Sequence, residues 1–173
     1  TWHVTGLKGT GSGDFTVTDL CVPKQRSVSF IADAPRNDAP LYKFPLFGLL
    51  ALGVASVAAG NARAALSEIT DLLQAKRTAG GGRSQSQRAS VQADIARATA
   101  AFSGAEAFME RAVQAAWQQA LGADPITTEA RGNLRLACAH MAETAADVCK
   151  TAYTLAGGSA VYLTSNLQRR FRD

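Results

Sequence analysis

Two long stretches of this chain place apolar residues at alternating spacings of four and three, which is the signature of one buried helix face. The first stretch covers residues 91–116, and its apolar positions are Val91, Ile95, Ala98, Phe102, Ala105, Met109, Ala112 and Ala116. The second covers residues 134–155, with Leu134, Cys138, Met141, Ala145, Val148, Ala152 and Leu155. Each stripe predicts a long helix that packs along its whole length against a neighbour.

The surrounding sequence indicates that these helices are antiparallel and closely packed. A Gly-Ala-Asp-Pro segment at 122–125 separates the stripes, with Asp124 predicted as N-cap and Pro125 as first helical residue. The chain has 34 alanines among 173 residues, and alanine is the strongest helix former. We therefore expect a mainly α protein with an up-and-down bundle, a stop at the glycine pair 157–158, and a last helix from Ala160.

The first part of the chain has a different character. Residues 1–5 and 15–22 alternate apolar and polar side chains, with a glycine-rich turn at 6–13 between them. This period of two predicts short β-strands, and a loop containing Pro35 and Pro40 separates them from the helical part. We expect a β fragment over residues 1–35 and a helical-bundle domain over residues 41–173.

Residues 44–62 carry no charge, and their number is about that needed to cross a bilayer. Three glycines, Ser56 and Asn61 interrupt this segment, which continues into an amphipathic stretch at 63–77. A transmembrane helix is one interpretation. A helix buried between neighbours in a bundle is the favoured one, with no membrane partner.

The charged residues and cysteines argue against several classes of function. Lys and Arg number 18 against 14 Asp and Glu, and they are scattered, unlike the concentrated basic surface of nucleic-acid proteins. Cys21, Cys138 and Cys149 follow no metal-ligand spacing and predict reduced thiols in a cytoplasmic protein. Residues 9–13 lack the third glycine of a dinucleotide fingerprint and lead into a strand rather than a helix. The two histidines, His3 and His140, form no triad pattern.

Two groups of arginines remain. Arg77, Arg83 and Arg88 flank a glycine triplet before a helix, where backbone N–H groups, the helix dipole and guanidinium donors suit a phosphate. A solvated basic loop is the alternative interpretation of this group. The run 169–172 is interpreted as an exposed or interface face of the last helix.

Three segments together resemble acyl-CoA dehydrogenase-like proteins over essentially the whole chain. Residues 1–23, TWHVTGLKGTGSGDFTVTDLCVP, resemble the last strands of that family's middle β-domain, whose pattern is W-x-V-x-G-x-[KR]-G-T-G-S. Residues 40–66 resemble the first helix of its C-terminal domain. Residues 156–173, AGGSAVYLTSNLQRRFRD, are similar to its Gly-Gly turn and L-Q-R-x-x-R-D helix.

Within that family, the G-T-G-S turn and the A-G-G-S-A-x-Y-x-x-S-x-L-Q-R pattern resemble the flavin-dependent monooxygenases. The glutamine and third glycine typical of dehydrogenases, Q-x-x-G-G-x-G-[YF], are missing here. The resemblance implies the C-terminal part of an oxygenase that hydroxylates an aromatic or heterocyclic substrate with O2 and reduced flavin from a separate reductase. An acyl-CoA dehydrogenase is the first alternative, and a non-enzymatic helical interaction module is the second.

The resemblance also implies an assembly and a site. It implies a four-helix bundle in a homo-oligomer, a dimer or tetramer, with flavin (FAD or FMN) between the β-domain of one subunit and the bundle of another. The residues implied in cofactor binding are Gly157, Gly158, Arg77 and Arg83, with Thr10 and Ser12 near the flavin ring or substrate. The catalytic residue is expected just beyond Asp173, so the chain by itself is expected to be inactive.

Overall fold

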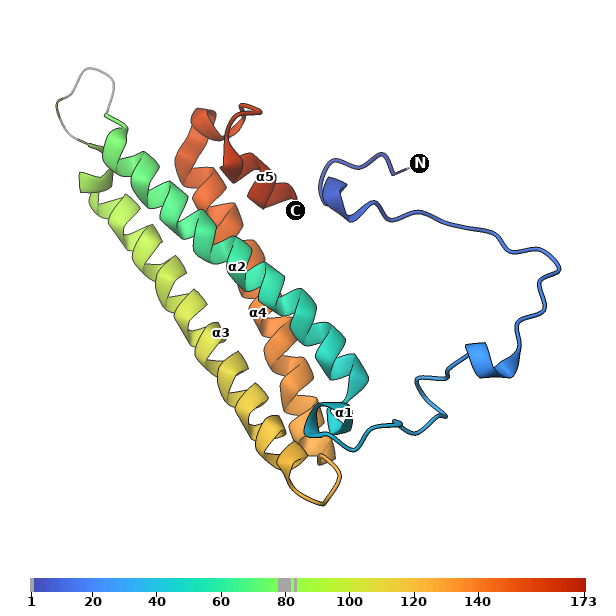
Figure 1. The fold of residues 1–173 in the computed structure, drawn as a ribbon. Coiled ribbons are helices and arrows are strands. Elements are labelled where there is room, and N and C mark those ends of the chain that lie inside the picture. Colours follow the sequence, from blue (N-terminus) through green and yellow to red (C-terminus); the bar gives the residue numbers. More distant parts are fainter. Residues whose placement is uncertain (1, 78–81, 83) are drawn as a thin grey trace.

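The structure, a computed structural model, describes residues 2–77, 82 and 84–173 and is mainly helical. Its helices are α1 (Pro40–Lys43), α2 (Leu46–Ala75), α3 (Ala89–Leu121), α4 (Thr128–Ala156) and α5 (Asn166–Arg172). Figure 1 shows α2, α3 and α4 running side by side as an antiparallel bundle, with the short α5 folded back along one end. The mainly α, up-and-down bundle predicted from the stripes is confirmed.

The two predicted stripes form the inner faces of α3 and α4. Phe102 and Ala105 of α3 are buried, as are Leu134, Met141 and Val148 of α4. α4 is the central helix, because it packs extensively against both α2 and α3, whereas α2 and α3 touch each other little. More than half of the buried apolar residues are alanines, whose small side chains allow this close helix packing.

The ends of α4 and α5 differ from their predicted positions. The N-cap of α4 is Thr127, whose hydroxyl accepts from the Ala130 N–H at 3.2 Å, so the prediction of Asp124 and Pro125 is wrong. Gln119 Oε1 accepts from the Thr127 N–H at 2.9 Å, so residues 122–126 form a connection and the helix starts after Thr127. The last helix was predicted to begin at Ala160 but begins at Asn166. The 3-10 turn Gly157–Ala160 and one further turn precede it.

No strand forms within residues 2–77, 82 and 84–173, so the short strands expected from the alternating residues are absent there, while the assignment of residues 1–35 to a β-domain stays a prediction. Residues 2–39 run as an irregular, exposed chain with two 3-10 turns, Lys8–Thr10 and Lys24–Arg26. Figure 1 shows this segment looping out from the bundle near α1 and returning beside the end of α5. A strand is stabilised by hydrogen bonds to a neighbouring strand, and the alternating residues meet no partner strand within the described chain.

α2 is buried on one side only. Ala55, Ala59 and Ala62 face the bundle core, whereas Val54 and Val57 on the opposite face are 68% and 74% exposed. Among the described helices it is the one long and apolar enough to cross a membrane by length and composition, and 22% of its most apolar window is buried. The helix expected to be buried between neighbours is thus buried on one face within the described chain, and a broad apolar face stays uncovered.

Candidate functional site

The predicted glycine pair and one predicted arginine lie at the same end of the bundle, where α2 and α4 both finish. Lys76 is the C-cap of α2, and its Nζ donates to the Ala156 carbonyl and the Ser159 Oγ, both at 3.0 Å. These bonds attach the end of α2 to the turn Gly157–Ala160. The structure thus brings Arg77, the next residue, to the same end of the bundle as Gly157 and Gly158.

The two glycines have different structural reasons for being glycine. Gly157 is the C-cap of α4 with φ 56° and ψ −139°, a conformation that other residues rarely adopt. Gly158 has no such restriction, and a Cβ built on it would meet nothing within 4 Å. Its backbone is therefore open to close approach by a ligand.

The structure describes one of the two arginines predicted to bind the cofactor, Arg77. Arg77 donates from Nη1 to the Gly82 carbonyl at 2.9 Å, and it forms an isolated antiparallel bridge with Ser84. The Ser84 hydroxyl in turn donates to the Leu73 carbonyl at 2.7 Å, which ties the loop back to α2. Arg83 lies outside the described residues. Arg77 and Lys76 therefore place two cationic side chains, adjacent in sequence, at this end of the bundle.

Thr10 and Ser12 lie in a different place, beside the last turn of α5. The Thr10 hydroxyl donates to the Leu7 carbonyl at 2.9 Å, and Ser12 Oγ donates to Thr10 Oγ1 at 3.2 Å. The Leu7 N–H donates to Asp173 Oδ1 at 2.7 Å. No contact in the described residues joins this turn to the glycine pair, so the predicted site residues form two groups.

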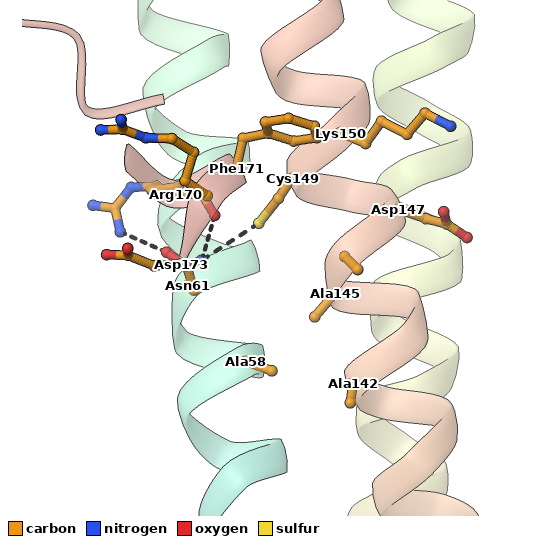
Figure 2. Close-up of a pocket in the computed structure, with 12 residues that line it drawn as sticks. Ala58, Asn61, Ala142, Ala145, Asp147, Cys149, Lys150, Arg170, Phe171 and Asp173 are labelled. Atoms are coloured by element: carbon orange, nitrogen blue, oxygen red, sulfur yellow. Dashed lines mark hydrogen bonds between the residues drawn. The ribbon is translucent and has the colours of Figure 1, made fainter. Parts of the chain in front are cut away.

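A cavity of about 350 Å³ lies between α2, α4 and α5, near the second group. Figure 2 shows Ala58 of α2 and Ala142 and Ala145 of α4 along its walls. Asn61, Cys149 and the end of α5 supply its polar atoms. Its volume is at the lower end of the range for small-molecule sites, which suits a ligand or a few side chains from an adjoining segment.

Arg170 lines this cavity and is held to α2 by a set of hydrogen bonds. Its Nε and Nη2 donate to Glu68 Oε1 at 3.0 and 2.6 Å, and its Nη1 donates to Asn61 Oδ1 at 3.1 Å. Asn61 Nδ2 donates back to the Arg170 carbonyl at 2.9 Å. The hydrogen bond to Glu68 raises the pKa of Arg170, so the guanidinium is charged at every accessible pH. Burial raises the pKa of the neighbouring Cys149 thiol, although the Arg170 charge partly opposes this.

Of the exposed or interface face expected at 169–172, Arg170 forms the part that lies at the interface of α5 with α2. Its side chain is 27% exposed, whereas that of Arg169 is 75% exposed. A signal in the sequence could have separated them, because Arg170 lies three residues after the buried Leu167 and so shares its helix face. Lys76 carried no such signal, since only the fold reveals that it reaches the end of α4.

The described residues suit binding and orientation more than proton transfer or metal chemistry. Within residues 2–77, 82 and 84–173, no group of three or more His, Cys, Asp or Glu side chains could hold a metal ion. His140 is exposed on α4, with its ring centroid 6.3 Å from that of Phe108. The two candidate features are thus a cationic, glycine-containing end of the bundle and a small cavity lined by α5.

Comparison with known proteins identifies the family of this chain. Residues 52–173 match the family model described as acyl-CoA dehydrogenase, C-terminal domain. Indole-3-acetate monooxygenase of Pseudomonas putida is 33% identical over 174 residues, covering 100% of this chain and 44% of the relative. The FADH(2)-dependent resorcinol hydroxylase oxygenase component of Rhizobium sp. (strain MTP-10005) is 31% identical over 118 residues, 61% of this chain and 29% of the relative.

Solved structures agree on the fold. XiaF from Streptomyces sp., in complex with FADH2 and glycerol, superposes with a TM-score of 0.89 at 22% identity, covering 100% of this chain and 46% of that one. The 3-HSA hydroxylase from Rhodococcus sp. RHA1 superposes with a TM-score of 0.88 at 24% identity, covering 100% and 47%. The chain thus spans less than half the length of these proteins.

Proposed function

The chain belongs to the acyl-CoA dehydrogenase C-terminal domain family, and from this premise we propose that it is part of a flavin-dependent monooxygenase. The whole protein would be the oxygenase component of a two-component system, hydroxylating an aromatic or heterocyclic small molecule with O2. The observation that carries this proposal is the 33% identity to indole-3-acetate monooxygenase, which extends over the entire chain.

The cationic end of the bundle fits the phosphate of a flavin, FAD or FMN. Lys76 and Arg77 would neutralise its charge, and the open backbone at Gly158 would accept its close approach. Gly157 would contribute by forming the turn that presents Gly158. Reduced flavin, when bound, supplies the electrons with which O2 is activated.

The other group of residues would act on the side of the substrate. Thr10 and Ser12 carry hydroxyl groups that can donate or accept hydrogen bonds, and their turn is attached to Asp173 through Leu7. We place the catalytic residue just after Asp173, in continuation of α5. We also place residues 1–35 in a β-domain of the whole protein, where partner strands would pair with the alternating residues.

The partners would be a flavin reductase and further copies of the same chain. The uncovered face of α2, which includes Leu50, Val54 and Val57, is an apolar surface of the kind that associates in water. Sedimentation of the purified chain at tens of micromolar is expected to give a dimer or tetramer. A clean monomer of about 18 kDa would contradict this assembly.

The activity is tested with the full-length protein, a flavin reductase and NADH in oxygenated buffer. Indole-3-acetate and resorcinol are the first substrates to test, and the expected result is a product that gains one oxygen atom together with O2 uptake. The dehydrogenase alternative predicts instead that an acyl-CoA thioester reduces bound oxidised flavin in the absence of O2. That reduction without any hydroxylated product would refute the proposal.

The phosphate site is tested by adding a methyl group at Gly158. Since the Cβ of Gly158→Ala meets no protein atom within 4 Å, the variant is expected to fold normally. It should raise the flavin Kd about tenfold, or about 1.4 kcal/mol, because the methyl occupies the approach to the backbone. Gly104→Ala on α3 is a matched control, since its Cβ also meets nothing within 4 Å. If both variants bind flavin with equal affinity, the flavin phosphate does not bind at Gly158.

A further inference from the structure

α5 is seven residues long, and a helix of that length is not stable by its own backbone hydrogen bonds. Three contacts hold it on the bundle. Leu167 is buried, and the Phe171 ring stacks on Tyr153 with centroids 4.7 Å apart and an interplanar angle of 19°. Burial of apolar surface is not directional, so these contacts define the register of the helix less sharply than hydrogen bonds do.

The third contact, from Arg170 to α2, is directional. Three N–H groups of its guanidinium are directed at Glu68 and Asn61, and Asn61 returns a hydrogen bond to the Arg170 carbonyl. That carbonyl belongs to the last turn of α5, where backbone acceptors lack partners within the helix. α2 therefore binds both the side chain and the backbone of one residue. A shift of α5 by one residue would rotate this side chain by about 100° and break every one of these bonds.

The same turn also holds the N-terminal segment. Asp173 Oδ1 accepts from the Leu7 N–H at 2.7 Å. Gly6 lies so close that a Cβ built on it would be 2.0 Å from the Arg172 carbonyl oxygen. The last turn of α5 thus connects α2 to the turn that carries Thr10 and Ser12.

We propose that Arg170 is a positioning residue of the monooxygenase, which through Glu68 and Asn61 sets the place of the last turn of α5. That turn in its place locates Thr10, Ser12 and the catalytic residue proposed after Asp173. This inference rests on the proposed function. Arg170 acts through these groups and needs no contact of its own with the substrate or flavin.

Arginine is required here by geometry more than by charge. Glu68 Oε1 accepts from two nitrogens of the planar guanidinium while the third reaches Asn61, an arrangement that a lysine ammonium on its flexible stem cannot reproduce. In Arg170→Lys the ammonium still neutralises Glu68, whose side chain is 28% exposed, so no partly buried carboxylate is left unpaired. Arg170→Lys should therefore change the global stability little while letting α5 move.

The experiment compares Arg170→Lys with Arg97→Lys in the full-length protein. Arg97 pairs with Asp94 on the surface of α3 and serves as the matched control. A displacement of about 1 Å at a reacting group can lower a rate by as much as ~100-fold. We expect Arg170→Lys to lower both kcat and the hydroxylated product formed per O2 consumed about tenfold, with KM within twofold. Amide hydrogen exchange in residues 166–172 should accelerate, while that of α3 and α4 stays unchanged.

Glu68→Gln should reproduce these effects, and the double variant should be no worse than Arg170→Lys, because both substitutions break one network. Unchanged exchange in α5 would overturn the proposal, as would faster exchange with normal product yield, which indicates a merely structural role. The same losses in Arg97→Lys would overturn it too. If the wild type oxidises acyl-CoA instead, the proposed function has failed, and the rate of flavin reduction replaces product yield as the test of Arg170.

Discussion

Gly157→Ala is predicted to destabilise the bundle by an amount that its backbone conformation determines. Gly157 ends α4 with φ 56° and ψ −139°, and nothing lies within 4 Å of a Cβ built there. The cost is therefore conformational and not steric, about 1–3 kcal/mol for a side chain in this region. Alanine also restricts the unfolded chain, which returns about 0.4–1 kcal/mol. With the midpoints of these ranges, about 2 and about 0.7 kcal/mol, the net loss is about 1.3 kcal/mol, equivalent to a Tm about 3–5 °C lower for a domain of this size.

The measurement is thermal unfolding followed by circular dichroism at a helical wavelength, with Gly158→Ala as the control. Gly158 has equally open surroundings and no positive φ, so its substitution should shift Tm by less than about 2 °C. The pair differs in backbone conformation alone. Equal Tm values for the two variants would show that the turn relaxes to accept a side chain, and the reasoning about Gly157 would be refuted.

Three further changes test the core, the contact of the N-terminal turn and the thiols. Leu134→Ala removes a fully buried side chain that packs against Gly48, which has no side chain to fill the space. The free energy of unfolding should fall by about 3 kcal/mol in urea titration, and a loss below about 1 kcal/mol would contradict this packing. Gly6→Ala places a Cβ 2.0 Å from the Arg172 carbonyl oxygen, so it should speed amide hydrogen exchange at Leu7 without changing Tm. Unchanged exchange would mean that the contact between Gly6 and Arg172 is absent in solution. Burial raises the pKa of Cys138 and Cys149, so a smaller fraction of each is thiolate at a given pH. A thiol reagent at pH 8 should therefore modify the exposed Cys21 first. Equal rates for all three cysteines would contradict the burial of Cys138 and Cys149.

The local sequence pattern was sufficient to predict the helices α3 and α4, which bury one face along their length. The stripes at 91–116 and 134–155 predicted which side chains of α3 and α4 are inside, because helical periodicity alone places them on one face. The glycine pair marked the end of α4 for the same local reason, since a positive φ favours glycine. Thr127 shows where local pattern failed. Asp124 and Pro125 are good start signals, but the side chain of Gln119 holds the connection in a different conformation.

By itself, then, the sequence determined the helical bundle, its buried faces and its resemblance to flavin-dependent monooxygenases. Only the tertiary structure decided which polar residues meet. Lys76 reaches the end of α4 across eighty positions of sequence, and Arg170 meets Asn61 and Glu68 across more than a hundred. No local pattern encodes such pairs, because they depend on how three helices and the short α5 pack together. Strand pairing has the same dependence, which is why the alternating residues of the first segment stay irregular where no partner strand meets them.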